Sequence, residues 1–439
     1  MKSSVVFAAL LVGFQTLAQP PQVSNVTVTQ DAASRRVTVS YNLDRDAIVT
    51  ARVYTNGVAL AGTALSAFVG DVHALVTNAA GATAHSFLWQ PVDGLEGVCL
   101  TDAVRVELTA WETDAPPDYL VADLRGPNVR YYASEADLPG GLGDDRYRTD
   151  FVVFRRIRAA GQSFKMGSAA TEFGRLANAG NYGNEDFHAV TFTKDFWLAV
   201  FETTQYQYWR MSGDWPSSYS NLTTRATRPV HRMSYATIRG TQWPTDGFDG
   251  VGGVLAKARA VTGLRLDLPT EAQWEFACRA GTTASLNGGI DVSASDAQLA
   301  VDPALSVLGR YAGNGGRLSD GSKPDYAAGD VAQAVARVGS YAPNAWGLYD
   351  LHGNVGEYCL DYCNYKDGNY GGLGAASVTD PVGATATDCR SHGDTDWNVR
   401  VVRGGSWDVA PKFCRSAARR YQIETGGSDA FGFRLAIQD

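Results

Sequence analysis

The 439-residue sequence contains no block of basic residues and, beyond its N-terminus, no long apolar run. Lys and Arg number 38 against 46 Asp and Glu, which gives a formal net charge of −8. A protein that binds nucleic acid needs a basic face to neutralise phosphates, so the charge argues against a nucleic-acid partner. A membrane-spanning helix needs roughly 20 consecutive apolar residues, so we also predict no membrane span.

Motifs of the zinc-binding type are missing as well. Neither Cys-x-x-Cys nor His-x-x-x-His spacing occurs among the six cysteines and six histidines, which leaves a structural zinc site without support. The histidines are scattered, and they form no readable catalytic triad or iron site. Methionine is rare, with four residues, whereas 47 glycines and many aromatic residues indicate a loop-rich fold held by aromatic clusters.

Residues 1–18 have the pattern of a signal peptide. Lys2 precedes the apolar run Val5–Val12, and Ala18 is a small residue at a suitable cleavage point. The apolar run is too short to cross a bilayer. We therefore expect a secreted or periplasmic protein. The alternative is that this segment forms a buried N-terminal strand or helix.

The even number of cysteines suits an oxidising, extracytoplasmic compartment, and we expect disulfides. Six thiols allow many pairings, and the sequence does not choose among them. Cys359 and Cys363 are four residues apart, so they either form a bridge or share a helical face. Cys278 follows Trp274 in a helical pattern and is expected to be a buried, inert thiol.

Residues 20–125 have the pattern of short strands separated by turns. Apolar and polar residues alternate in Val23–Thr29 and Arg36–Tyr41, and Asn56-Gly57 suits a tight hairpin turn. This pattern predicts a small all-β sandwich of immunoglobulin-like type. It contains no catalytic constellation, so we expect a spacer or binding module, followed by a linker at residues 126–147.

Helix signals appear in the remainder of the chain. Thr270 can cap a helix and Gln273 completes a capping box, which predicts a helix that ends at Gly281. A second helix fits Gly253–Val261, and a third begins near Thr203. Long irregular segments follow residue 280, and in a compact domain such loops usually indicate function or bound ions.

Motifs in residues 148–437 follow a specific order: Phe164–Ser168, Phe201–Tyr206, Arg228–Ser234, Leu268–Phe276, Trp346–Glu357, Arg403–Trp407 and Gly432–Leu435. This series resembles the formylglycine-generating enzyme family, also called sulfatase-modifying factors. The resemblance implies an α+β fold related to C-type lectins, low in regular structure and stabilised by calcium. It also implies copper bound by two cysteines and the use of oxygen to convert a sulfatase cysteine to formylglycine. Two thiolates suit Cu(I), because soft ligands select a soft ion.

The sequence departs from the family pattern at the expected copper site. The two family cysteine positions are Val409 and Cys414, so an apolar side chain replaces one sulfur. In a second alignment, Cys414–Arg419 matches a Cys-Arg-Ser-Ala-x-Arg sequence that also occurs in relatives without oxidase chemistry. The gap that this alignment requires would remove the active-site loop altogether. The resemblance implies catalytic roles for Cys414 and Ser406 and substrate-binding roles for Trp407 and Arg419.

The family's calcium site is better matched. Asp350, Gly353, Val355 and Glu357 occupy its positions and imply two carboxylate ligands and two backbone carbonyl ligands. Hard oxygen donors on a tight turn suit calcium, which tolerates irregular geometry. The alternative is a loop held by hydrogen bonds, with Glu357 in solvent.

Two classes of function remain open. We expect a secreted family member that lacks the two-cysteine copper site and acts as a calcium-stabilised binding or scaffold protein for a protein or carbohydrate ligand. The alternative is an atypical oxygen-dependent enzyme that acts on a sulfatase, with a second sulfur from Cys359, Cys363 or Cys389. The aromatic stretch Tyr358–Tyr370 either lines a carbohydrate or peptide groove or belongs to the core.

Overall fold

The computed structural model divides the chain into two compact units. The first extends to Pro116 without Ala61–Thr63, and the second comprises Pro117–Asp439 together with Ala61–Thr63. The structure describes residues 19–62, 68–90, 104–175, 185–219, 223–241, 243–293, 296–324, 333–363, 377–383 and 398–438. Within these ranges, no helix has both the length and the apolar character needed to cross a membrane.

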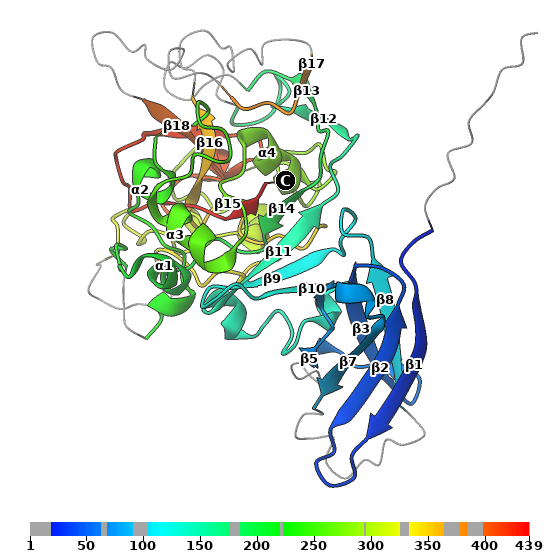
Figure 1. Cartoon of the computed structure of the whole chain (residues 1–439). Coiled ribbons are helices and arrows are strands. Elements are labelled where there is room, and N and C mark those ends of the chain that lie inside the picture. Colours follow the sequence, from blue (N-terminus) through cyan, green and yellow to red (C-terminus); the bar gives the residue numbers. More distant parts are fainter. Residues whose placement is uncertain are drawn as a thin grey trace, which may run out of the picture. The chain divides into compact units, whose positions relative to one another are not determined.

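The first unit is built from antiparallel strands in two sheets (Figure 1). One sheet has the order β1-β2-β7-β5, and the other has the order β4-β3-β6 with β8 also paired to β3. Side chains from both sheets form one buried cluster, which includes Val39, Val49 and Trp89. The strands are β1 Val23–Gln30, β2 Val37–Leu43, β3 Ala47–Thr55, β4 Val58–Ala59, β5 Phe68–Gly70, β6 Ala74–Val76, β7 Ala84–Trp89 and β8 Val104–Trp111.

The local sequence explains these strands. Every second side chain of β2 is buried, as expected for a strand with one face on a core. Asn56 and Gly57 connect β3 to β4 with φ angles of 49° and 78°, and a two-residue turn of type I′ requires positive values at both positions. The predicted strands at Val23–Thr29 and Arg36–Tyr41 and the predicted turn are therefore confirmed.

The boundary between the units differs from the predicted one. Strands β9 Tyr119–Asp123 and β10 Val129–Tyr132 lie where the sequence indicated the end of the β-module and a linker at 126–147. Both strands instead belong to the second unit, because β10 pairs with β9 and β9 pairs with β11 Phe151–Ile157. Every residue of β9 is buried, so its sequence lacks the alternation that would have marked it as a strand.

The second unit contains a six-stranded sheet with the order β10-β9-β11-β14-β21-β15. Its two faces are both buried: Leu120 and Ala122 belong to one apolar cluster, whereas Tyr119 and Val121 belong to another. Smaller sheets have the orders β19-β18-β16-β20 and β12-β13-β17. The further strands are β12 Ser163–Met166, β13 His188–Thr191, β14 Phe196–Ala199, β15 Leu266–Asp267, β16 Gly356–Tyr362, β17 Ser377–Thr379, β18 Val399–Arg403, β19 Arg419–Ile423, β20 Phe431–Gly432 and β21 Ala436–Ile437.

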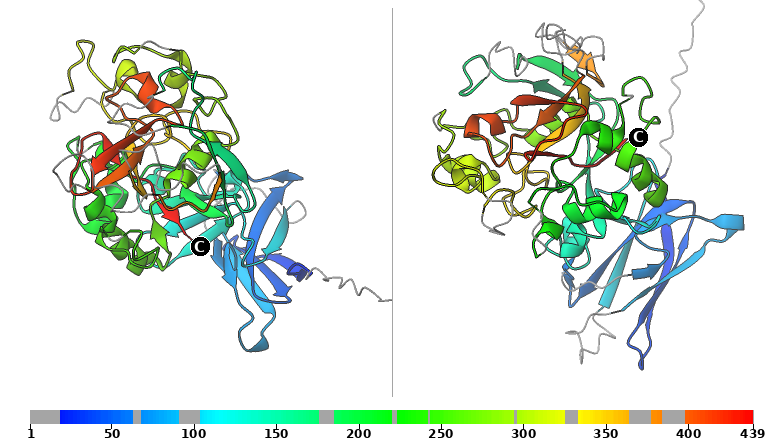
Figure 2. Two further views of the ribbon diagram at one scale, coloured as in Figure 1. Left: turned by 90° about the horizontal axis from the view of Figure 1, so that it is seen from above. Right: turned by 90° about the vertical axis from the view of Figure 1, so that its left-hand side faces the viewer.

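Short helices make the second unit an α+β structure. Helices α1, α2 and α3 lie together in all views, in green, and α4 contacts β16 (Figures 1 and 2). Thr204 and Thr270 cap α1 and α4 within capping boxes, and α3 ends at Gly263 in the left-handed conformation. The three predicted helices are confirmed, although α4 ends at Arg279 and its left-handed C-cap residue is Ala280 rather than Gly281. The helices are α1 Gln205–Ser212, α2 Tyr235–Arg239, α3 Gly253–Thr262, α4 Glu271–Arg279 and α5 Pro303–Leu308.

Candidate functional site

The loop that leads into β16 carries the predicted calcium ligands and has an unusual backbone. Asp350 and Asn354 adopt φ angles of 58° and 60°, and Gly353 has a φ of 114°. A Cβ atom at Gly353 would lie 2.1 Å from the backbone oxygen of Arg310, so this position excludes every other residue. Two non-glycine residues in the left-handed region persist only where the surroundings hold them there. The surrounding structure therefore fixes the backbone conformation of this tight Gly-Asn turn.

Glu357 is neither in solvent, as one alternative predicted, nor without protein partners, as we would expect of a calcium ligand. Its side chain is completely buried. Arg434 donates to Oε2 through Nε and to Oε1 through a terminal nitrogen, both at 2.6 Å, and the Trp274 indole donates to Oε2 at 2.7 Å. The carboxylate is thus already bound by a bidentate guanidinium. The prediction that Glu357 is a calcium ligand is not supported by this arrangement.

Asp350 has the opposite character. Its Oδ2 accepts a hydrogen bond from the backbone N–H of Gly339 at 2.6 Å, whereas its buried Oδ1 has no hydrogen-bond partner. Burial raises the pKa of Asp350 to about 6. A buried carboxylate oxygen normally has a partner, so this atom is a ready ligand for a cation.

Glu202 is a buried carboxylate of this site to which sequence reasoning assigned no role. Its Oε1 accepts from the backbone N–H of Val355 at 2.9 Å, and its Oε2 accepts from the Asn354 amide at 2.5 Å. Burial, followed by the nearby charges of Asp350 and Glu357, raises the pKa of Glu202 well above its usual value. The available signal was its position in the motif Phe201–Tyr206.

The charge balance of this loop fits a bound cation. Three buried carboxylates, those of Glu202, Asp350 and Glu357, lie near two buried guanidinium groups, those of Arg434 and Arg148. Among the described residues, however, no group of three His, Cys, Asp or Glu side chains is arranged as a metal-ligand set. A calcium ion here would therefore combine Asp350 Oδ1 with backbone carbonyls, which suits its preference for oxygen ligands in irregular geometry.

Cys414 lies after β18, at the end of the short helical turn Pro411–Cys414. Its thiol is free and fully buried among Leu286, Val292, Leu305 and Tyr311, and Val409 packs against the same cluster. Burial raises the pKa of the Cys414 thiol to about 12. A reactive or metal-binding cysteine needs its thiolate, so this environment favours an inert thiol.

No disulfide joins Cys414 to another described cysteine, although His352 links it to Cys278: His352 Nδ1 lies 2.7 Å from the backbone oxygen of Cys414, and Nε2 lies 3.8 Å from the Cys278 Sγ. Cys278 and Cys359 are free, buried thiols that belong to a different apolar cluster. Burial raises the pKa of Cys278 to about 12, in agreement with the predicted inert thiol. Cys359 lies on strand β16 and its thiol is free, so both alternatives for Cys359 and Cys363, a bridge and a shared helical face, are wrong. Cys99 and Cys389 lie outside the described residues.

Ser406 and Trp407, which follow β18, are both buried. Ser406 donates from its hydroxyl to Asp408 Oδ1 at 2.8 Å, which is an ordinary turn contact. The Trp407 indole donates to the backbone oxygen of Asp429 at 3.1 Å, and its ring packs edge-on against Tyr219. Because the Trp407 side chain is completely buried, the predicted substrate-binding role of this residue is not supported.

Arg419 belongs to a buried network of charges. Its guanidinium donates to Glu271 Oε2 at 2.6 Å, and Arg403 also contacts Glu271, at 3.3 Å. Glu275 pairs with Arg403 and with Arg279, the latter at 2.8 Å. All five side chains are buried, so Arg419 anchors α4 to β18 and β19, and its predicted role in substrate binding is not supported either.

The aromatic groove that the sequence left open as one interpretation is not present in the described part of that stretch. Tyr358 and Tyr362 lie on β16 and are buried. The Tyr358 hydroxyl donates to the backbone oxygen of Gly426 at 3.0 Å. These residues are core, while residues 364–370 lie outside the described part of the chain.

His231 is completely buried and belongs to a row of rings that ends at Trp407. Its ring lies 5.6 Å from that of Tyr219, which in turn lies 5.3 Å from that of Trp407. Nε2 accepts from the backbone N–H of Tyr219 at 3.2 Å, so Nδ1 carries the proton and faces the backbone oxygen of Pro229 at 3.2 Å. Burial lowers the pKa of His231 to about 4, so the neutral ring supports this loop.

We expect His231→Gln to reduce the acid sensitivity of the second unit. Between pH 6.5 and 4 the unfolded wild type binds a proton at His231 that the folded state does not, so stability falls as pH falls. Relative to the variant, the wild type should lose about 2–3 kcal/mol of unfolding free energy between pH 7.5 and 4.5. Urea unfolding at several pH values measures this loss, and parallel pH profiles would contradict a neutral buried His231.

The model of the sulfatase-modifying factor enzyme 1-like domain matches residues 154–439. This chain belongs to the sulfatase-modifying factor family. Its relatives include the formylglycine-generating enzyme of Thermomonospora curvata, 31% identical over 173 residues, which are 38% of this chain and 48% of that protein. The serine/threonine-protein kinase pkn1 of Chlamydia caviae is 26% identical over 306 residues, 65% of this chain and 41% of that protein.

The chain spans about half the length of the formylglycine-generating enzymes that it matches. Among solved structures, PvdO from Pseudomonas aeruginosa is 21% identical with a TM-score of 0.43, and the match covers 65% of this chain and 94% of that one. The residues that the family model matches, 154–439, all lie in the second unit.

The sulfatase-modifying factor motifs meet in the interior of the second unit. Trp274, Glu357 and Arg434 come from three different motifs and form one hydrogen-bonded set of buried side chains, and Glu202, from a fourth motif, is buried where their charges affect it. A polar network of this kind, in which partners come from distant segments, specifies one packing arrangement. The motif order in the sequence therefore reflects a shared scaffold.

Proposed function

We propose that this sulfatase-modifying factor family member is an exported, calcium-stabilised binding or scaffold protein that lacks the family's copper site. Residues 1–18 act as its signal peptide, so the mature protein is secreted or periplasmic. The first unit is an immunoglobulin-like sandwich that serves as a spacer, and the family domain is related to C-type lectins. A protein or carbohydrate is its ligand.

The pair Val409 and Cys414 carries this proposal. Cu(I) needs soft sulfur ligands, and a valine side chain offers no lone pair. The remaining thiol is buried in an apolar cluster that raises its pKa to about 12. A single protonated sulfur in such surroundings holds copper weakly, which supports a role other than cysteine oxidation.

A peptide assay tests this role directly. The protein is incubated with copper, oxygen and a peptide that carries the sulfatase signature Cys-x-Pro-x-Arg, and mass spectrometry detects conversion of the thiol to the aldehyde. We expect no conversion by the wild type or by Cys414→Ser, while a two-cysteine formylglycine-generating enzyme converts the peptide in parallel. Robust turnover by the wild type that is lost in Cys414→Ser would overturn the binding role.

The alternative function is an atypical oxygen-dependent enzyme that oxidises a sulfatase cysteine. The family of the chain and the names of its relatives favour it. It needs a second sulfur near Cys414, whereas Cys359 and Cys363 lie in another apolar cluster. Of the three candidates, this leaves Cys389, which lies outside the described residues. Turnover lost in both Cys414→Ser and Cys389→Ser would establish this alternative and make a sulfatase the partner.

A further inference from the structure

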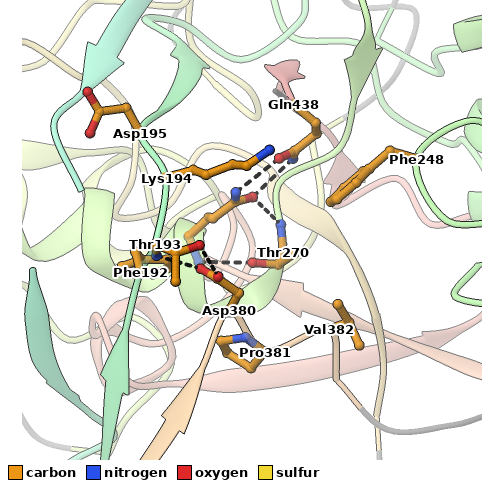
Figure 3. A pocket seen from close by; sticks show the side chains of 11 residues that line it. Phe192, Thr193, Lys194, Asp195, Phe248, Thr270, Asp380, Pro381, Val382 and Gln438 are labelled. Carbon is orange, nitrogen blue, oxygen red and sulfur yellow. Dashed lines mark hydrogen bonds between the residues drawn. The ribbon is translucent and has the colours of Figure 1, made fainter. Parts of the chain in front are cut away.

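A pocket of about 310 Å³ opens on the second unit, at the lower end of the size range of small-molecule sites. It is lined by the turn between β13 and β14, the segment that follows β17, the start of α4, Phe248 and Gln438 (Figure 3). Neither Cys414 nor the loop from Asp350 to Glu357 contributes to its lining. The pocket is therefore distinct from the sites discussed above.

One wall of the pocket presents fixed hydrogen-bonding groups. The side-chain amides of Gln273 and Gln438 donate to each other reciprocally, both at 3.0 Å. Gln273 Oε1 also accepts from the backbone N–H of Thr270 at 2.9 Å, and Gln438 Nε2 also donates to the backbone oxygen of Leu268 at 3.1 Å. An amide has two N–H donors and two acceptor lone pairs. This pair consequently keeps a donor on Gln273 and an acceptor on Gln438 in fixed positions.

The charges around the pocket nearly cancel. Asp380 accepts hydrogen bonds from the backbone N–H of Thr193, at 2.9 Å, and from its hydroxyl. Asp195 forms an ion pair with Arg156 at 2.8 Å, and Lys194 lines the side that Thr193 also forms. The two carboxylates would repel a polyanion, and the lysine would repel a cation. A neutral polar ligand is repelled by neither.

The opposite side of the pocket is apolar. Phe248 and Val382 lie across from Lys194 and Thr193, with Pro381 between them (Figure 3). The Phe248 ring rests on Trp243 with a centroid distance of 4.8 Å, and the Trp243 indole donates to the backbone oxygen of Val382 at 3.3 Å. These contacts fix an aromatic ring and an aliphatic side chain in the wall of the cavity.

We propose that this pocket binds a neutral sugar ring. A pyranose has one face of C–H groups, which suits an aromatic ring, and an edge of hydroxyls that both donate and accept hydrogen bonds. The pocket offers the matching pair of surfaces at the matching size, and its charges nearly cancel, so they do not favour an ionic ligand. The inference rests on the proposed binding role and gives it a ligand class.

Saturation-transfer NMR on the full chain tests the assignment. The probes are neutral monosaccharides, a neutral glucan oligomer and a high-mannose glycopeptide, which separate a polysaccharide source from a glycoprotein source; glucuronate and inorganic phosphate serve as charged probes. We expect transfer to a neutral sugar, with the affinity reduced about tenfold in Phe248→Ala. Val382→Arg fills the pocket from a position that is 43% exposed and should abolish the signal without disturbing the fold.

Matched controls exist outside the pocket. Phe187→Ala removes an aromatic ring that is 42% exposed, and Val307→Arg adds a charge at a position that is 58% exposed; neither should change sugar binding. Absence of transfer from every neutral sugar, binding that survives both pocket variants, or a response to the charged probes alone overturns the proposal. The peptide oxidation assay is independent of sugar binding. If the protein does not oxidise the peptide and binds no sugar, only the sugar assignment is wrong. If it oxidises the peptide and binds sugar, only the proposed function is wrong.

Discussion

Arg434→Met is expected to lower the unfolding free energy of the second unit by about 3–5 kcal/mol. The guanidinium is fully buried and binds both oxygens of Glu357 at 2.6 Å. It also donates to the backbone oxygens of Ala199 and Tyr349, at 3.1 and 2.8 Å. Its removal leaves a buried carboxylate without its counter-charge, and the large effect comes from that orphaned charge.

Urea unfolding, followed by a probe of the second unit, measures this loss. Arg146→Met is the matched control, because Arg146 forms an ion pair with Asp144 while its own side chain is 56% exposed; we expect a change of at most about 1 kcal/mol. Adding Glu357→Gln to Arg434→Met should restore part of the stability, since it removes the uncompensated charge. A loss of similar size in both single variants would contradict the account.

Calcium is expected to raise the unfolding free energy of the wild type and to have no effect on Asp350→Asn. Asp350 Oδ1 is the buried oxygen without a partner, so the ion should bind there and neutralise part of the negative charge. For a dissociation constant of 10⁻⁴–10⁻³ M, typical of extracellular sites, 10 mM calcium stabilises by about 1.4–2.7 kcal/mol. The chelated wild type should lose this increment.

Thermal or urea unfolding with calcium, with magnesium and with chelator measures the effect. Asp267→Asn is the matched control, because this buried carboxylate is paired with Arg239 at 2.8 Å; it should lower stability but retain the calcium increment. Asp350→Asn should show the reverse pattern, since it removes a buried negative charge that has no partner. An equal calcium increment in Asp350→Asn and the wild type would show that the ion binds elsewhere.

Local signals in the sequence were sufficient for the elements that depend on neighbouring residues. The Thr270–Gln273 capping box, the Asn56-Gly57 turn and the alternation of Arg36–Tyr41 all lie where predicted. Each involves groups within a few residues of one another, so the chain does not need its tertiary structure to satisfy them. The ordered motifs likewise indicated the family, which the match to residues 154–439 confirms.

Elements whose partners are distant in sequence were interpreted less well. Residues 119–132 were divided between a β-module and a linker, yet they form two strands of the six-stranded sheet, because β9 pairs with β11 and β10 pairs with β9. The family resemblance assigned Arg419 and Trp407 to substrate binding. Both are buried because Glu271 and Tyr219 approach them from other parts of the chain.

By itself, therefore, the sequence determined the family, the local secondary structure and the absence of a second sulfur at Val409. Only the tertiary structure decided which polar groups neutralise one another. It pairs Glu357 with Arg434 across 77 residues and leaves Asp350 Oδ1 without a partner. It also brings Gln273 and Gln438 together across 165 residues to form a pocket wall. Burying a polar group costs free energy unless it has a hydrogen-bonding or charged partner. Because the partners of these side chains come from distant segments, only the folded chain shows which of them are paired.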